Sequence, residues 1–166
     1  PHKTAIDKHL MLMRHPKTLV FATSYMRDAQ AWESRYQRWF QYYRQSPLGQ
    51  FPLVLIDDGS PFVPNNPTVI LSDADECLDI KPTCLNVIRF PDNLGRCSLA
   101  NYPGWWRSFL FSAVLAKQAG FSKIIHVESD AYILSDRFYN RILGTEDGWT
   151  TFWLPTYQLP ETAIQI

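Results

Sequence analysis

Residues 123–134 read Lys-Ile-Ile-His-Val-Glu-Ser-Asp-Ala-Tyr-Ile-Leu, an apolar run that two carboxylates interrupt. The first half is rich in β-branched residues, namely Ile124, Ile125 and Val127. A short run of this kind is typical of a buried strand in a parallel sheet, particularly when it follows a helix that a glycine closes. We therefore expect this strand to lie near the centre of an α/β sheet.

Glu128 and Asp130 fall at the carboxyl end of that strand. Ligands of open α/β sheets bind in the crevice beyond the carboxyl ends of the strands, so acids placed there face a candidate site. Two acids separated by one residue point the same way if the segment stays extended. Together they predict a site for Mg²⁺ or Mn²⁺, which prefer oxygen ligands and often share them with substrate phosphates. The competing interpretation is that both acids begin a solvated turn.

Length and composition favour one soluble globular domain. The 166 residues suffice for a single core, and the apolar runs are too short to span a bilayer. Lys plus Arg and Asp plus Glu both number 16, so no net charge attracts nucleic acid or an anionic membrane. Cys77, Cys84 and Cys97 are odd in number and lack the paired spacing of metal ligands. With no secretory signal before the fold, they indicate a reduced, cytoplasmic setting.

In the rest of the chain, short apolar runs alternate with segments that have helical periodicity. This order predicts a three-layer α/β fold with a mostly parallel sheet. The expected strands are 19–22, 51–56, 68–71, 85–90 and 149–154. The expected helices are 4–14, one capped by Asp28 and ended by 46–49, one from Pro103 to Gly120, a short one after Ser135, and one beginning at 160–162.

Two of these helices carry many apolar side chains. On the helix after Asp28 an aromatic stripe recurs at three- and four-residue intervals, which favours core packing over a sugar platform; its members are Trp32, Tyr36, Trp39, Phe40 and Tyr43. On the helix after Pro103 the apolar residues wrap most of the circumference, so we expect burial on more than one side; they are Trp106, Phe109, Leu110, Ala113, Val114 and Ala116.

Polar loops follow the first, second and fourth expected strands. Thr23-Ser24-Tyr25 ends the first, and Asp57-Asp58-Gly59-Ser60 ends the second. A right-handed βαβ connection brings these two loops together, where the acids can accept hydrogen bonds from a ribose or a base. An Asp-Gly turn explains Asp58-Gly59 but leaves Asp57 unexplained. Arg96 follows the strand 85–90 and is a candidate partner for a diphosphate.

Asp73-Ala74-Asp75 is a rival acidic motif for the metal. The apolar run before it is short, and no expected helix leads into it. Glu76 and Asp79 continue the charge, as in a solvated loop. We therefore favour Glu128 and Asp130 as the metal site and keep Asp73 and Asp75 as the alternative.

In this order, the motifs resemble those of the GT-A glycosyltransferases, most closely the family 2 type. That family combines a small hydroxyl loop after the first strand, an Asp-Asp-Gly-Ser loop after the second, an Asn-x-Gly segment, a helix, and a strand that ends in an Asp-x-Asp-like motif. The matching segments cover about residues 19 to 134; they are 21–25, 54–60, 93–96 and 126–130.

The resemblance implies transfer of a sugar from a UDP- or GDP-sugar to a hydroxyl of a glycan or lipid-linked acceptor, with Mn or Mg as cofactor. A divalent cation offsets the charge that develops on the diphosphate leaving group. By this resemblance Thr23, Tyr25, Asp57 and Asp58 surround the nucleoside, Arg96 lies near the diphosphate, and Glu128 lies near the ribose. Ser129 also binds the nucleotide-sugar, and Asp130 ligates the metal. Glu128 departs from the family, which usually has Asp there, and its longer arm puts its direct contact in doubt.

An inverting transferase also needs a base for the acceptor hydroxyl. In the family this acid follows the strand after the metal motif, and Glu161 is the only acid after Trp153. Glu161 is therefore the candidate catalytic base, against the alternative of a first-turn glutamate favoured by the helix dipole. A retaining mechanism stays open. The resemblance implies one GT-A-like domain over 1–166 with a shortened acceptor half, acting in polysaccharide or lipid-linked glycan biosynthesis in the cytoplasm or at a membrane surface.

Two alternatives remain. A sugar nucleotidyltransferase normally opens with a glycine-rich loop, and residues 19–27 contain no glycine. A non-catalytic GT-A-like module would hold a nucleotide or a partner protein without turnover. The sequence shows no Gly-x-Gly-x-x-Gly dinucleotide motif, no zinc-ligand spacing and no Gly-x-Ser-x-Gly elbow.

Overall fold

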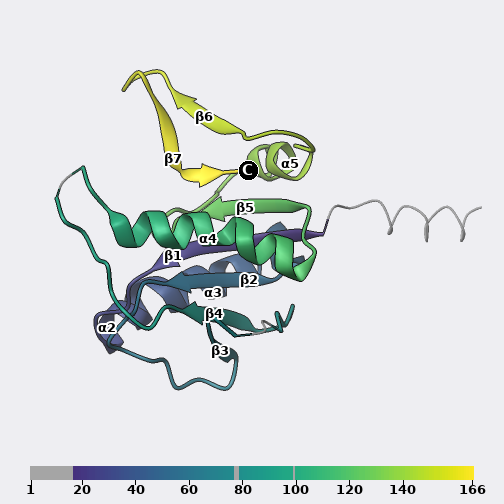
Figure 1. Ribbon diagram of the computed structural model, residues 1–166. Helices are drawn as coiled ribbons and strands as arrows, with labels where there is room; N and C mark the ends of the chain where they lie inside the picture. Colours follow the sequence, from purple (N-terminus) through teal and green to yellow (C-terminus); the bar gives the residue numbers. More distant parts are fainter. Residues whose placement is uncertain (1–16, 77–78, 99) are drawn as a thin grey trace, which may run out of the picture.

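The computed structural model describes residues 17–76, 79–98 and 100–166, and at its centre lies a seven-stranded sheet (Figure 1). The strand order is β3-β4-β2-β1-β5-β7-β6. The strands are β1 (Thr18–Ser24), β2 (Leu53–Asp57), β3 (Val69–Asp73), β4 (Leu85–Arg89), β5 (Lys123–Val127), β6 (Thr151–Leu154) and β7 (Leu159–Gln165). β1 to β5 run parallel, whereas β7 is antiparallel to β5 and β6. The predicted α/β class with a mostly parallel sheet is confirmed.

The described residues form six helical segments, and local chemistry favours some of their boundaries. They are α2 (Ala29–Ala31), the π-helical turn η1 (Trp32–Tyr36), α3 (Gln37–Arg44), the 3₁₀ turn η2 (Pro47–Gln50), α4 (Pro103–Ala119) and α5 (Asp136–Leu143). Asp28 caps the first of them by accepting a hydrogen bond from the Ala31 amide at 2.7 Å. Gly120 ends α4 with a φ of 73°, a left-handed conformation that glycine adopts without strain.

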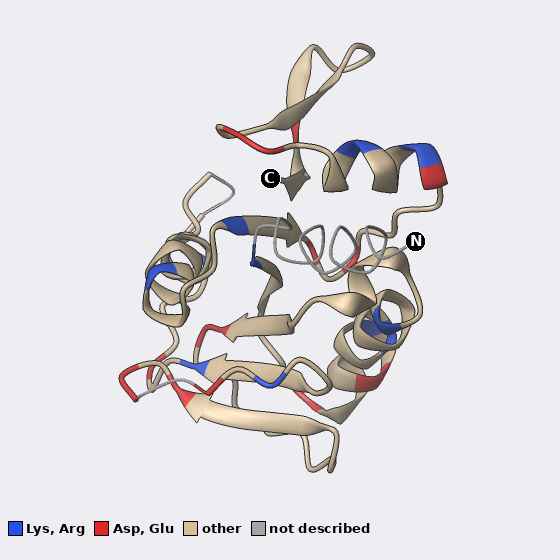
Figure 2. Cartoon of the chain, turned by 90° about the vertical axis from the view of Figure 1, so that its right-hand side faces the viewer, with Lys and Arg blue, Asp and Glu red and all other residues tan. Residues whose placement is uncertain are grey.

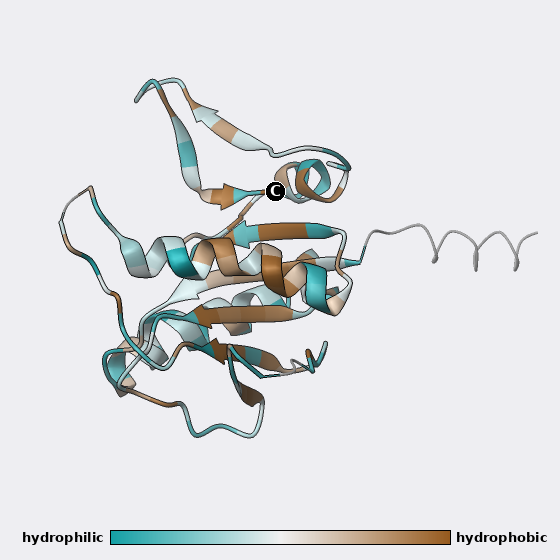
Figure 3. Ribbon diagram, viewed as in Figure 1, coloured by the Kyte–Doolittle hydropathy of each residue, from teal (hydrophilic) through white to brown (hydrophobic). Residues whose placement is uncertain are grey.

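Apolar side chains of the strands alternate between two cores, one on each face of the sheet. On one face Leu19, Phe21 and Val54 belong to the core that contains Leu115 of α4. On the other face the strands pack against the aromatic stripe, in which Trp39 and Tyr43 are completely buried. Burying each such side chain stabilises the fold by about 1.5–3 kcal/mol. The core interpretation of the stripe is correct, and apolar residues concentrate in the central strands (Figure 3).

The expected burial of α4 on more than one side is wrong for one face. Trp106, Leu110 and Val114 are 49%, 62% and 47% exposed. The side of α4 that is buried carries mostly small residues, namely Gly104, Ser108, Ser112, Leu115 and Ala116. Small side chains let the helix approach the sheet closely, and counting apolar residues around the helix does not reveal this.

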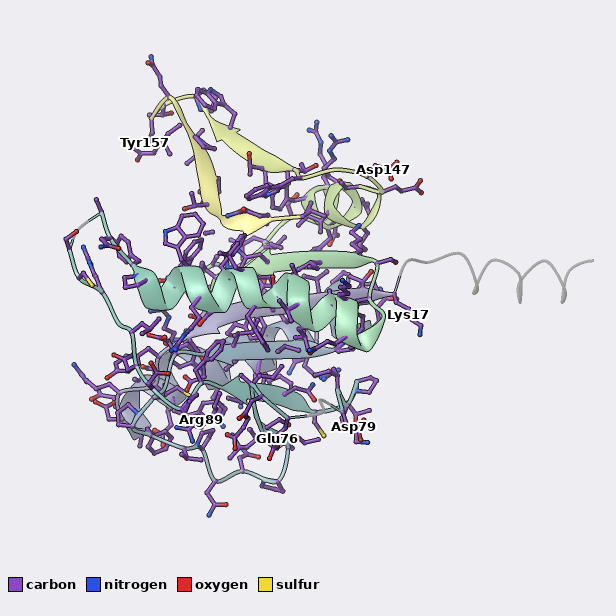
Figure 4. All side chains as sticks on the ribbon, viewed as in Figure 1. Lys17, Glu76, Asp79, Arg89, Asp147 and Tyr157 are labelled. Atoms are coloured by element: carbon purple, nitrogen blue, oxygen red, sulfur yellow. The ribbon has the colours of Figure 1, made fainter. Side chains whose placement is uncertain are left out.

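The helix expected at 160–162 is also wrong, because these residues belong to β7. Pro160 pairs with Trp153 of β6, so a hairpin forms in place of a helix. The first turn of a helix and the start of a strand both tolerate a residue without an N–H. Pro160 was therefore compatible with either structure. Tyr157 lies at the tip of the hairpin, away from the rest of the sheet (Figure 4).

The expected helix 4–14 and Cys77 lie outside the described residues. Within 17–76, 79–98 and 100–166, no helix is both long and apolar enough to cross a membrane. Acidic and basic residues are interspersed over the helices and loops (Figure 2).

Candidate functional site

The carboxyl ends of β1, β2, β4 and β5 meet at one edge of the sheet, because these strands are parallel (Figure 1). The register aligns Ser24 with Asp57 and Asp57 with Arg89. The polar loops after the strands, far apart in the sequence, therefore lie side by side at the place where open α/β sheets bind ligands.

A pocket of about 380 Å³ opens at this edge, and we call it the edge pocket. Four residues predicted from the sequence line it: Thr23, Tyr25, Asp58 and Arg96. They come from the end of β1 and the residue after it, the loop after β2, and the segment that precedes α4. The predicted neighbourhood of these motifs is present in the structure. Their role in binding a nucleotide stays a prediction.

Asp57 does not line the edge pocket; it is completely buried beneath it. Its carboxylate accepts hydrogen bonds from Ser24 Oγ at 3.1 Å, from Ser60 N at 2.9 Å and from Ser60 Oγ, and lies 3.4 Å from Arg89 Nε. Burial raises the pKa of Asp57, although the hydrogen bonds from Ser60 and Ser24 and the charge of Arg89 oppose this rise. Asp57 thus anchors the loop after β2, and its own oxygens are all engaged.

Asp58 joins three segments of the pocket wall. Its carboxylate accepts hydrogen bonds from Gly95 N and Asn93 Nδ2, both at 2.8 Å, and it forms an ion pair with Arg107. Gly104, near the start of α4, packs directly against it, because an added Cβ there would lie 1.9 Å from Asp58 Oδ2. The helix therefore reaches the pocket only because residue 104 has no side chain.

Glu128 is a mostly buried carboxylate surrounded by donors. Thr23 Oγ1 lies 3.2 and 3.1 Å from its two oxygens, Trp105 Nε1 donates to Oε1, and His126 Nε2 is 3.3 Å from Oε1. Burial by itself would raise the pKa of Glu128, but the contact with His126 and the hydrogen bonds from Trp105 and Thr23 hold it below its ordinary value. Glu128 is therefore ionised at neutral pH, and both of its oxygens already have protein partners.

Asp130 differs sharply from Glu128, although only one residue separates them. The chain turns after Glu128, with Ala131 N donating to Glu128 O at 2.9 Å, so the extended segment expected here does not form. The Asp130 side chain is 68% exposed and lies 3.2 Å from Arg35 Nη2. Ser129 is buried, and its Oγ accepts a hydrogen bond from Arg35 Nε at 2.6 Å. The two acids point to different places, and only Asp130 is open to solvent.

Arg96 and Arg35 supply positive charge to the edge pocket. Arg96 donates to Ser98 O at 2.8 Å, and its guanidinium carbon lies 4.5 Å from the centre of the Tyr102 ring. It forms no ion pair with any carboxylate of the described residues. Its charge is therefore available to an anionic ligand.

A second cavity, of about 590 Å³, lies beside the edge pocket, and we call it the aromatic cleft. Tyr102 and Trp105 line both cavities. The aromatic cleft also contains Glu128 and Glu161, so the predicted base lies in the neighbouring cavity and not in the edge pocket. Glu161 projects from β7, where Ala163 N donates to its Oε1 at 2.7 Å.

The sequence did not identify several residues of the site, among them Arg35 and Trp105, which line the edge pocket, and Arg107, which pairs with Asp58. Arg35 and Tyr36 lie in the π-helical turn η1, and both line the edge pocket. π-Helical turns are rare and often occur at functional sites, but no pattern in the sequence indicates one. Arg35 resembled the other arginines on the polar face of its helix. Trp105 and Arg107 gave no signal beyond helical periodicity.

The rival acids are placed elsewhere. Asp73 ends β3, an outer strand of the sheet, and Asp75 lies in the turn that follows. Neither lines the edge pocket or the aromatic cleft, and Asp130 lines neither cavity itself; it differs from the rival acids in its ion pair with Arg35, which does line the edge pocket. Among the residues that the structure describes, no group of three or more His, Cys, Asp and Glu side chains is close enough to hold a metal ion by itself.

Comparison with known proteins identifies no family for the chain. No family model matches the chain, and neither a curated protein nor a solved structure is significantly similar to it.

Proposed function

We propose that the protein is a glycosyltransferase that moves a sugar from a UDP- or GDP-sugar to an acceptor hydroxyl. The observation that supports this proposal is the edge pocket. It gathers hydroxyl, aromatic, acidic and guanidinium groups from the end of β1, from η1, from the start of α4 and from the loops between them, at the carboxyl edge of a parallel sheet. Its volume of about 380 Å³ lies within the range of small-ligand sites.

The two arginines of the edge pocket suit the diphosphate of such a donor. A guanidinium presents several N–H donors in a fixed fork and remains charged at any physiological pH. Arg96 has no carboxylate partner among the described residues, and Arg35 shares its charge with one exposed carboxylate, Asp130. Thr23 and Tyr25 lie at the end of β1, where they suit contacts with the nucleoside.

A divalent metal fits these residues only if the donor shares it. Mg²⁺ and Mn²⁺ are commonly held by one or two carboxylates together with substrate phosphates. Asp130 is the candidate, because its carboxylate is 68% exposed and its ion-pair partner Arg35 lines the edge pocket, although Asp130 itself lies outside the pocket wall. Glu128 is not a candidate, because N–H and O–H donors surround its oxygens. A bound metal would offset charge on the departing diphosphate.

Glu161 is the proposed base of the transfer. Its carboxylate takes the proton of the acceptor hydroxyl, whose oxygen then bonds to the anomeric carbon of the donor sugar. The bond from that carbon to the diphosphate oxygen breaks, and its electron pair leaves with the nucleoside diphosphate. Glu161 lies in the aromatic cleft, across Tyr102 and Trp105 from the edge pocket, so donor and acceptor would meet at this shared wall.

The test is calorimetric titration of UDP and GDP, each with and without Mn²⁺, into the wild-type protein, Asp130→Asn and Asp75→Asn. We expect one nucleotide to bind in a metal-dependent way, Asp130→Asn to abolish the metal dependence, and Asp75→Asn to leave it unchanged. The reverse result for the two variants would move the metal to the rival motif. If neither nucleotide binds, the donor site is wrong.

Binding and turnover are separated by a second measurement. Hydrolysis or transfer of the sugar from the matching nucleotide-sugar should be lost in Glu161→Gln while nucleotide affinity is retained. If the wild-type protein binds the nucleotide but never releases it from the nucleotide-sugar, the non-catalytic alternative replaces the enzyme.

A further inference from the structure

The aromatic cleft has an architecture unlike that of the edge pocket, and its charge is opposite. Among the described residues that line it there is no Lys or Arg, whereas Glu128 and Glu161 both face it. Such a cavity disfavours a phosphorylated ligand and suits a neutral one that carries many hydroxyl donors. Thr151 and Thr162 add hydroxyl groups to its walls.

Two exposed tryptophans give the cleft flat apolar faces. Trp149 is 71% exposed and Trp106 is 49% exposed, although both belong to the cavity wall. Trp149 is nevertheless held in one orientation, because its Nε1 donates to Gln165 Oε1 at 2.9 Å and its ring stacks on Phe109 with 6.3 Å between centroids. An exposed indole that is already held in one orientation loses little side-chain entropy when a ligand binds, and this favours binding.

We propose that the aromatic cleft is the acceptor site and that it takes a saccharide ring, with the ring's C–H face against Trp149 and its hydroxyls toward Glu161. This inference rests on the proposed function and names the acceptor class that the function left open. A sugar ring has an apolar face and a rim of hydroxyls, which matches an indole face beside a carboxylate.

The contrast with the aromatic stripe of η1 and α3 strengthens the assignment. There Trp39 and Tyr43 are completely buried and serve the core. The tryptophan of the cleft instead projects from the segment before β6, and most of its surface is open. Core packing accounts for Trp39 and Tyr43, whereas the contacts of Trp149 with Gln165 and Phe109 orient its ring and leave most of its surface exposed.

The experiment is saturation-transfer NMR with three neutral probes, methyl β-D-glucoside, methyl β-D-galactoside and methyl α-D-mannoside, recorded without nucleotide and again in the presence of UDP or GDP. We expect ring-proton signals for at least one probe. Trp149→Ala should weaken its affinity about tenfold, whereas Trp149→Phe should retain most of it because a flat aromatic face remains. Nucleotide affinity, measured in parallel, should be unchanged in both variants.

Trp153→Ala is the matched control, because Trp153 is 61% exposed on the same hairpin and does not line the aromatic cleft. The proposal is overturned if none of the three glycosides binds, or if Trp153→Ala weakens binding as much as Trp149→Ala. Nucleotide binding without glycoside binding would refute this inference alone. Glycoside binding that depends on Trp149, without binding of either nucleotide, would support a saccharide site and refute the donor site.

Discussion

The loop after β2 and the loop after β5 carry similar acids in similar positions, and the structure uses them differently. Asp57 and Asp58 are almost fully buried, and each of their four oxygens accepts a hydrogen bond or an ion pair. After β5, Glu128 is likewise mostly buried and surrounded by donors, whereas Asp130 is exposed and meets one arginine. An acidic residue at the end of a strand therefore predicts only that the residue lies near a site. The hydrogen-bond donors around its carboxylate decide whether it supports the pocket wall or is open to a ligand.

The cost of burial explains this division. Moving a carboxylate out of water costs several kcal/mol of free energy unless hydrogen-bond donors of the protein replace its hydration. Asp57 is held by Ser24, Ser60 and Arg89, so its replacement leaves those groups without their partner. Asp130 keeps its water, and a ligand can exchange with that water at little cost.

The largest expected effect is that of Asp57→Ala. Removing the buried carboxylate takes the opposite charge away from Arg89 and the acceptor away from two serine hydroxyls, which should cost about 3–5 kcal/mol of unfolding free energy. Urea denaturation followed by circular dichroism measures it. Asp57→Asn keeps the volume and supplies a value if the alanine variant does not fold.

Asp130→Ala is the control for that comparison, and its cost should stay within about 0.5 kcal/mol because the side chain is largely solvated. Equal losses for the two variants would contradict the division between a supporting acid and an open one.

A smaller loss is expected from Gly104→Ala. The added Cβ would lie 1.9 Å from Asp58 Oδ2, so the carboxylate must leave its place between Arg107 and Gly95. We expect a cost of about 2–3 kcal/mol, together with weaker nucleotide binding, because Asp58 holds the pocket wall. Thermal unfolding and calorimetry measure the two effects.

Gly148→Ala separates backbone strain from this close approach. Gly148 has a φ of 79°, but nothing lies within 4 Å of an added Cβ. Its cost should be about 1 kcal/mol, from the left-handed conformation alone. If the two glycine variants lose the same stability, the contact between Gly104 and Asp58 contributes nothing.

The pH dependence of stability should run in opposite directions for Asp57 and Glu128. Burial raises the pKa of Asp57, so the folded protein binds that proton more tightly than the unfolded chain does. The contribution of Asp57 to stability therefore rises as the pH falls from neutrality toward the ordinary value of 3.8. The stability deficit of Asp57→Asn relative to the wild type should grow over that range.

For Glu128, burial raises the pKa but His126, Trp105 and Thr23 lower it by more. Its stabilising contribution is present above the ordinary value of 4.5 and is lost as the pH falls through the folded pKa. The deficit of Glu128→Gln should therefore shrink on acidification. Each unit of pKa difference corresponds to about 1.4 kcal/mol, and denaturant titrations over a pH series will show whether the two slopes have opposite signs.

Local signals explain what could be predicted from the sequence. The β-branched runs, the cap at Asp28 and the glycine at the end of α4 each act within a few residues, so the sequence reveals them directly. The parallel order then brings the loops after β1 and β2 to one edge. For this reason the location of the edge pocket followed from the sequence.

Long-range pairing explains what could not be predicted. Arg107 meets Asp58 across 49 positions, and no local pattern marks either residue as the other's partner. The β6–β7 hairpin depends on pairing between strands, while its proline suggested a helix. The π-helical turn that carries Arg35 replaces ordinary helix without any distinguishing residue.

A small effect is also expected for the coupling between Arg35 and Asp130, which a double-mutant cycle with Arg35→Ala and Asp130→Asn measures. Their side chains are 43% and 68% exposed, so water and salt screen the 3.2 Å pair, and the coupling should stay below about 1 kcal/mol. Added salt should reduce it further.

The pair of Arg107 and Asp58, whose side chains are 20% and 8% exposed, provides the opposite case. A cycle with Arg107→Ala and Asp58→Asn should give a larger coupling that salt changes less, because the surrounding protein excludes water. A strong, salt-resistant coupling between Arg35 and Asp130 would instead make their bridge part of the supporting structure. Asp130 would then resemble Asp57, and a metal would have to displace Arg35 before it could bind there.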